Sequence, residues 1–157
     1  MTSSYFILKA LHVTGVVVFL GNIIVTAWWK MAADRTRDPA TIAYAQRQVT
    51  VTDFIFTAAG AVLIVGAGDA MAYGYYSDSW AVPWIFWGRV LFFSVGAIWL
   101  LVLIPIQVWQ ARLAHAFARG GVIPRRYWVL GRIWIVAGLV AIVVPLAVLW
   151  IMVMKPM

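Results

Sequence analysis

The stretch Tyr5–Trp29, YFILKALHVTGVVVFLGNIIVTAWW, decides the fold of this chain. It is longer than the run of about 20 apolar residues that a helix needs to cross a bilayer. Steps of three and four residues place a polar seam on one helix face, made of His12, Gly15, Phe19, Asn22, Thr26 and Trp29. The other faces are almost wholly Val, Ile, Leu and Ala. We therefore predict a membrane-spanning helix whose seam faces partner helices instead of lipid.

The composition of the whole chain is that of an integral membrane protein. Of its 157 residues, 65% are hydrophobic and 11% are charged, against about a quarter charged in a typical soluble domain. The net charge of +7 comes mostly from basic residues that flank apolar segments. Contact with anionic lipid headgroups explains that charge better than nucleic acid does. The chain has no Cys, which excludes disulfides, thiolate metal sites and cysteine nucleophiles.

Four apolar segments predict an all-α, four-helix transmembrane bundle that forms a single domain over residues 1–157. The expected spans are about 5–29, 51–73, 83–110 and 127–152. A polar loop is expected from Met31, and Asp38-Pro39 is a strong start for the second helix. The third helix should run past its span to Gly120-Gly121, which end it. The second and third helices are therefore predicted to extend into the cytoplasm.

The distribution of basic residues predicts the orientation. The first and third connections, with the helix ends beside them, carry nine basic residues: Lys30, Arg35, Arg37, Arg47, Arg112, Arg119, Arg125, Arg126 and Arg132. The second connection has neither Lys nor Arg and holds Asp78. The positive-inside rule then places both termini outside and both basic connections in the cytoplasm.

Three ionisable residues from three helices fall in one outer layer, which we call the outer site: His12, Asp69 and Arg89. An unpaired charge at this depth costs a few kcal/mol, so such residues pair with one another or serve a function. His12 either bonds to a neighbouring helix or binds a cofactor. Asp69 and Arg89 either form a structural ion pair or belong to the same cofactor site.

A second polar layer is expected near the cytoplasmic boundary, where Asp53 and Arg132 would pair and fix the second helix against the fourth. Asp53 and Asp69 are turned to nearly opposite faces of one helix, so the two layers are expected to stay separate. His115 lies about 30 Å or more from the layer of His12 by helix rise. Ligation of one haem by both histidines of the chain is therefore excluded.

The motifs of the common hydrolases, metalloenzymes and nucleotide-binding proteins are missing from the sequence. An intramembrane histidine among aromatic residues can still bind haem iron, bond to a quinone or carry a proton. A five-coordinate haem b needs one imidazole, which His12 would supply, and Arg89 would then pair with a haem propionate.

The segments LKALHVTGVVVFLGN (residues 8–22), Trp28-Trp29-Lys30 and MVMKP (residues 152–156), with Asp53 opening the second span, resemble a bacterial family of predicted integral membrane proteins. The first-helix pattern is also similar to HemJ-type protoporphyrinogen oxidases and CopD-type copper-resistance proteins. The HemJ resemblance implies a haem-associated histidine, a role that maps only onto His12. The family resemblance implies a multi-pass protein of the bacterial inner membrane.

Two classes of function follow from the sequence. In the first, the protein is a non-catalytic accessory subunit whose apolar faces and basic helix ends dock onto a larger membrane complex. In the second, it binds haem or a quinone at the outer site. The expected partners are the bilayer with its bound lipids, and a membrane complex or further copies of the chain, but no nucleic acid.

Overall fold

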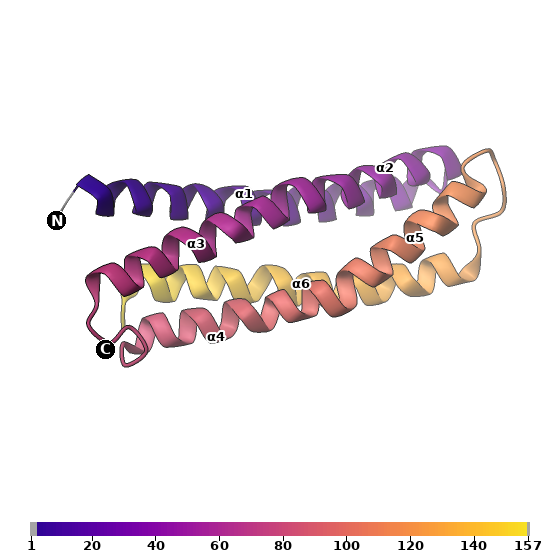
Figure 1. Cartoon of the computed structure of the whole chain (residues 1–157). Coiled ribbons are helices and arrows are strands. Elements are labelled where there is room, and N and C mark those ends of the chain that lie inside the picture. Colours follow the sequence, from indigo (N-terminus) through magenta and orange to yellow (C-terminus); the bar gives the residue numbers. More distant parts are fainter. Residues whose placement is uncertain (1–2, 157) are drawn as a thin grey trace.

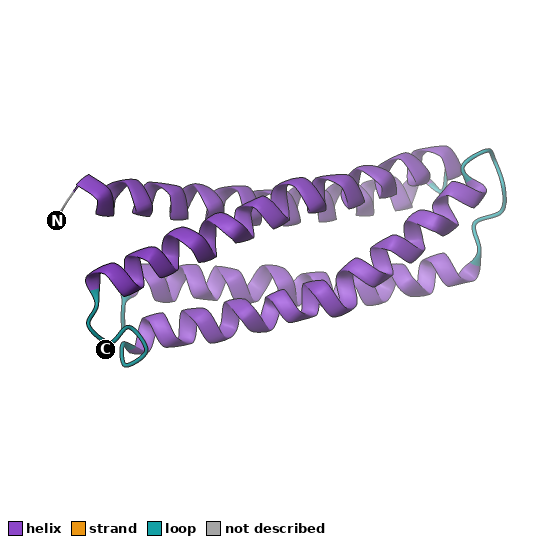
Figure 2. Cartoon of the chain, viewed as in Figure 1, coloured by secondary structure: helices purple, strands orange, loops and turns teal. Residues whose placement is uncertain are grey.

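The structure, a computed structural model, describes residues 3–156. Figures 1 and 2 show long helices lying along one another, with the connections confined to the two ends of the bundle. The helical segments are, in chain order, α1 (Ser3–Thr36), α2 (Pro39–Thr52), the π-helical η1 (Asp53–Thr57), α3 (Ala58–Tyr75), α4 (Pro83–Ile98), the π-helical η2 (Trp99–Leu103), α5 (Ile104–Phe117) and α6 (Arg125–Met154).

These segments make four continuous helices, because η1 joins α2 to α3 and η2 joins α4 to α5. Each of the four is long and apolar enough to cross a membrane. The predicted all-α, four-helix transmembrane bundle is confirmed for the described residues. At about 1.5 Å per residue, α1 alone is roughly 50 Å long, which exceeds the hydrocarbon core of about 30 Å.

Both termini lie at one end of the bundle, together with the connection between α3 and α4, and the other two connections lie at the opposite end (Figure 1). We call the half with the termini the terminal half and the other the connection half. In the terminal half, α1 packs on α3 and α4 packs on α6. In the connection half, α2 packs on α1 and α5, and α5 packs on α6.

Local sequence signals set the start of α2 and the end of α5 as expected, but not the end of α1. The Asp38 side chain accepts a hydrogen bond from the backbone N–H of Thr41, and Pro39 occupies the first turn of α2. After α5, Gly120 adopts a φ of +90°, a conformation that glycine reaches without steric cost. The loop expected from Met31 is wrong, since α1 continues to Thr36. An ion pair one helical turn apart, between Lys30 and Asp34, supports this extension.

The polar seam of α1 faces its partner helices for most of its length. Gly15, Phe19 and Thr26 are buried. The seam then continues to Lys30, which is 1% exposed, and leaves Trp29 on the outside at 57%. The expectation for Trp29 is therefore wrong, because a period of 3.6 residues carried on from Thr26 reaches Lys30 instead.

Close contact between α1 and α3 depends on two glycines. A methyl group on Gly60 would lie 2.8 Å from the backbone nitrogen of Phe19 and 2.9 Å from the carbonyl oxygen of Gly15. The two backbones thus touch at this crossing, as small residues allow in membrane helices. Another face of this helix also carries small residues, but these are exposed: Ala59, Gly66 and Ala70.

Candidate functional site

Asp69 and Arg89 of the outer site form an ion pair between α3 and α4. Arg89 donates from Nε and Nη2 to Asp69 Oδ1, over 2.9 and 2.8 Å, and from Nη1 to Ser79 Oγ over 3.1 Å. Its guanidinium also lies 5.0 Å from the ring centre of Tyr73 and 4.5 Å from that of Trp80. Arg89 is thus held on every side by its own chain.

His12 packs against α3, and no hydrogen bond of the described residues joins it to Asp69 or Arg89. Its Nδ1 lies 2.8 Å from the carbonyl oxygen of Ile64. A carbonyl only accepts, so Nδ1 carries the proton and donates it. The ring fits because residue 68 is glycine: a methyl there would lie 2.9 Å from Nδ1. His12 thus bonds to the backbone of α3, whereas Asp69 and Arg89 bond to each other.

The second polar layer is centred on Asp53, which is 5% exposed. Two side chains donate to its Oδ1: Thr57 Oγ1 over 2.6 Å and Asn22 Nδ2 over 3.4 Å. Two others donate to Oδ2: Gln107 Nε2 over 2.8 Å and Trp99 Nε1 over 3.1 Å. We call these five residues the Asp53 cluster. Its members come from α1, η1, η2 and α5.

Arg132 is not part of the Asp53 cluster. Its side chain is exposed, and the ion pairs of residues 3–156 do not include one between Arg132 and Asp53. The expected boundary pair is thus absent from the structure, since the rotation of α6 turns Trp134 and Gly131 inward and Arg132 outward. Neutral donors take the place of the expected cation around Asp53.

A third buried polar group was not predicted from the sequence. We call it the Lys30 cluster, and it consists of Lys30, Asp34, Gln46 and Tyr127. Lys30 Nζ donates to Asp34 Oδ2 over 3.2 Å and to the Tyr127 hydroxyl over 2.9 Å. The Tyr127 hydroxyl lies 3.1 Å from Asp34 Oδ1 and 3.4 Å from Gln46 Oε1. The helical spacing of Lys30 and Asp34 was visible in the sequence, but their burial depends on α2 and α6.

Four buried polar atoms of the connection half have no hydrogen-bond partner within the described part of the chain. They are Gln46 Nε2, Gln107 Oε1, Gln110 Oε1 and Trp134 Nε1. Such orphans are rare in folded proteins, and each calls for an explanation. All four lie on the interior of α2, α5 and α6, between and around the Asp53 and Lys30 clusters.

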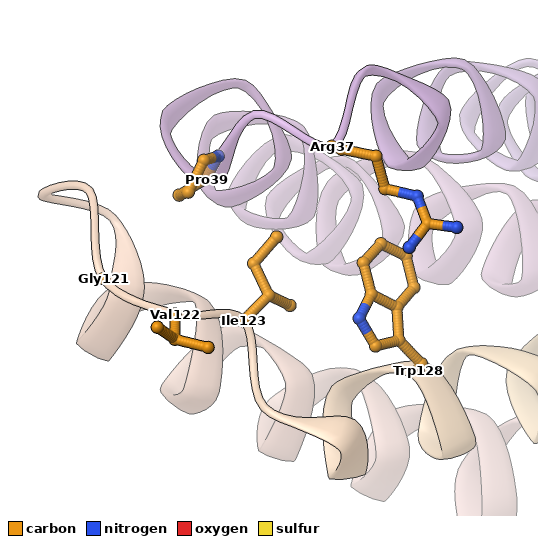
Figure 3. A pocket seen from close by; sticks show the side chains of 6 residues that line it. All are labelled: Arg37, Pro39, Gly121, Val122, Ile123 and Trp128. Atoms are coloured by element: carbon orange, nitrogen blue, oxygen red, sulfur yellow. The ribbon is translucent and has the colours of Figure 1, made fainter.

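A surface pocket of about 470 Å³ lies at the end of the connection half. Its walls come from the two connections there and from the start of α6 (Figure 3): Arg37, Pro39, Gly121, Val122, Ile123 and Trp128. The Arg37 guanidinium lies 4.6 Å from the ring centre of Trp128. Arg37 has a φ of 57°, in the left-handed region that a residue with a side chain seldom adopts. Val122 is 93% exposed.

A metal centre built from several protein ligands is not found. Within residues 3–156, no three side chains of His, Asp or Glu come together in a way that would hold a metal ion. His115 is exposed and lines a separate groove of about 420 Å³ with Thr50 and Arg112. The sequence-based separation of the two histidines agrees with their positions on α1 and α5.

No curated protein and no solved structure matches the chain. The likeness to HemJ- and CopD-type proteins stays a sequence-based expectation. One family model matches residues 6–156. Because this match covers nearly the whole chain, together with its four membrane-spanning helices, the chain belongs to the family described as "Predicted integral membrane protein (DUF2269)".

Proposed function

We propose that the protein is a non-catalytic accessory subunit that docks onto a larger membrane complex through the end of its connection half. The pocket of Arg37 and Trp128 carries this proposal, because it lies at the end of the bundle where the two connections meet the start of α6, and it combines an apolar wall with a cation. The flat face of Trp128 holds the Arg37 guanidinium, which makes no hydrogen bond among the described residues and keeps its N–H groups free for a partner.

The environment of the outer site supports a non-catalytic role. The Arg89 guanidinium donates two hydrogen bonds to Asp69 and one to Ser79. An intramembrane ion pair of this kind holds helices together. Each guanidinium nitrogen of Arg89 is thus already engaged in a hydrogen bond.

Purification in a mild detergent, with the composition of the complex measured by mass spectrometry, tests the proposal. We expect a stoichiometric protein partner with the wild type and with the control Arg47→Ala, which changes an exposed cation away from the pocket. The double variant Arg37→Ala/Val122→Asp should lose that partner and stay folded. A wild-type monomer of full stability, without a partner, would contradict the proposal.

A second candidate is a haem- or quinone-binding protein that uses His12, and the hydrogen bond of its Nδ1 favours it. Donation from Nδ1 to Ile64 leaves Nε2 with its lone pair, and histidines that bind metal are commonly fixed in this way. The neutral ring would then offer Nε2 to haem iron or to the hydroxyl of a reduced quinone. Arg89 fits a haem propionate poorly, since its donors are already engaged.

The absorption spectrum of the purified protein separates these candidates. Haem binding predicts a Soret band that is lost in His12→Ala and kept in the control His115→Ala. Quinone binding predicts a colourless protein from which solvent extracts a quinone, again only when His12 is intact. A folded protein that shows no Soret band and yields no quinone would exclude this second candidate and leave only the accessory role.

A further inference from the structure

The Asp53 cluster places an acidic side chain inside a membrane bundle, and no cation of residues 3–156 forms an ion pair with it. The groups that contact Asp53 are Thr57 from its own helix, Asn22 from α1, Trp99 from η2 and Gln107 from α5. None of these side chains titrates in the physiological range. The charged groups nearest along α1, Lys30 and Asp34, bond to each other and to Tyr127.

Gln107 is 1% exposed and uses only one side of its amide. Its Nε2 donates to Asp53 Oδ2, whereas its Oε1 is buried without a partner. Half a turn of this amide would exchange the two atoms and present Oε1 to Asp53. An acceptor at that position suits a protonated carboxyl group, just as the donor suits a carboxylate.

Both charge states of Asp53 can therefore be satisfied. In the carboxylate, Oδ1 accepts from Thr57 and Asn22, and Oδ2 accepts from Trp99 and Gln107. After a proton binds to Oδ2, the new O–H donates to Gln107 Oε1 and the other three bonds remain. The cost of burying a neutral carboxyl group is then low, because every polar atom of that group keeps a partner.

Both π-helical segments of the protein's described residues belong to this cluster. η1 begins with Asp53 and ends with Thr57, and η2 begins with Trp99. Well under 1% of residues in proteins are π-helical, and such segments frequently occur at functional sites. Pro105, just after η2, accounts for a local irregularity there. No proline or glycine lies within η1, so the position of Asp53 has no such explanation.

The orphaned polar atoms connect this cluster with the end of the bundle. Gln107 and Gln110 lie one turn apart on α5, and Gln110 donates to the backbone oxygen of Tyr127. Tyr127 in turn belongs to the Lys30 cluster, whose Asp34 is 16% exposed. The orphans comprise two donors and two acceptors, a mixture that water satisfies because each water molecule donates and accepts.

We propose that Asp53 is a proton-binding site that exchanges one proton with the cytoplasmic side through water held along Gln107, Gln110 and Gln46, and that Gln107 rotates when the proton binds. A hydronium ion supplies the proton, a covalent O–H bond forms at Oδ2, and water is left. The bond from Gln107 Nε2 to Oδ2 is replaced by the bond from Oδ2 to Gln107 Oε1. This inference does not depend on the proposed docking role.

Nuclear magnetic resonance on the detergent-solubilised protein tests the proposal. All five acidic residues of the chain are aspartates, so label at the aspartate carboxyl carbon gives five signals to follow. We expect the Asp53 signal to shift with pH while the protein stays folded. The side-chain amide signals of Gln107 should shift with the same midpoint, and those of Gln48, which lies outside the cluster, should not follow.

Variants test whether the pH-dependent signal belongs to Asp53 and whether the proton moves along the proposed water route. Asp53→Asn should remove the shifting signal, and Asp69→Asn should leave it in place. If Asp53→Asn does not fold, the pH titration of the wild type still tests the proposal. In Gln107→Leu, the midpoint of the Asp53 signal should differ from that of the wild type. After a pH jump, Gln46→Leu/Gln110→Leu should slow the response of Asp53. An Asp53 signal that stays constant in the folded protein, or a Gln107 amide that ignores it, would overturn the proposal.

Discussion

Asp69 of α3 and Arg89 of α4 form an ion pair in the terminal half of the bundle, with Arg89 Nη2 2.8 Å from Asp69 Oδ1. In that half α1 packs on α3 and α4 packs on α6. The pair joins α3 to α4 and so bridges the two helix pairs, assisted by the contact of Phe19 with Phe92 between α1 and α4. An intramembrane charge has a clear structural role here.

Removal of one partner of this pair should destabilise the bundle. Arg89→Leu leaves Asp69 without its cation, at an expected cost of about 3 kcal/mol, the low end for a broken buried pair. The low end applies because Asp69 is 34% exposed. Thermal unfolding in detergent measures the loss. The double variant Asp69→Leu/Arg89→Leu should recover much of it, and Lys9→Ala, at an exposed position, should change little; equal losses in the single and double variants would contradict the assignment.

Substitution of Gly60 should separate α1 from α3. The methyl group of Gly60→Ala would press on the backbone of α1, which cannot yield as a flexible side chain would, and overpacking costs about 1–3 kcal/mol. Gly66 offers a matched control, because nothing lies within 4 Å of a methyl group built on it. Gly66→Ala should hold or raise the melting temperature, since alanine favours helix by up to about 1 kcal/mol. Equal effects at both glycines would show that the crossing is not as close as described.

The cap of α2 should make a pH-dependent contribution to stability. Hydrogen bonds from Thr41, first from its side chain and then from its backbone, lower the pKa of Asp38 from its ordinary value. A carboxyl whose pKa is lower in the folded state stabilises the fold above its unfolded pKa of about 3.9 and loses that contribution as the pH falls further. Asp38→Ala should therefore lower the melting temperature at pH 7 and have a smaller effect below about pH 4. An effect of the same size at both pH values would exclude the charged cap.

The orientation predicted from the basic residues can be checked with single cysteines, since the chain has none of its own. Cysteines introduced by Arg37→Cys and Arg119→Cys should react with a membrane-impermeant reagent only after the cells are opened. Ser77→Cys, in the connection between α3 and α4, should react in intact cells. The reverse labelling pattern would show that the predicted orientation is wrong. The proposed proton exchange of Asp53 would then take place with the opposite side of the membrane.

Local signals explain why so much of the fold followed from the sequence. Apolar runs longer than a bilayer is thick left few alternatives to membrane helices. Single residues marked two of the helix ends: Asp38 and Pro39 mark the start of α2, and a glycine follows α5. Comparison of depth along the helices was enough to bring Asp69 and Arg89 into one layer, where the structure pairs them.

The rotation of each helix about its axis was decided only by tertiary packing. The contact of Gly15 with Gly60 fixes how α1 meets α3, and the rotation of α6 turns Arg132 away from Asp53. The same packing buries Lys30 beside Tyr127 and brings Asn22, Trp99 and Gln107 to Asp53. The sequence by itself thus determined four membrane helices, the start of α2 and the end of α5, because length, hydropathy and capping act locally. The partners of the buried polar residues depend on side chains far apart in the chain, and only the packed bundle selects them.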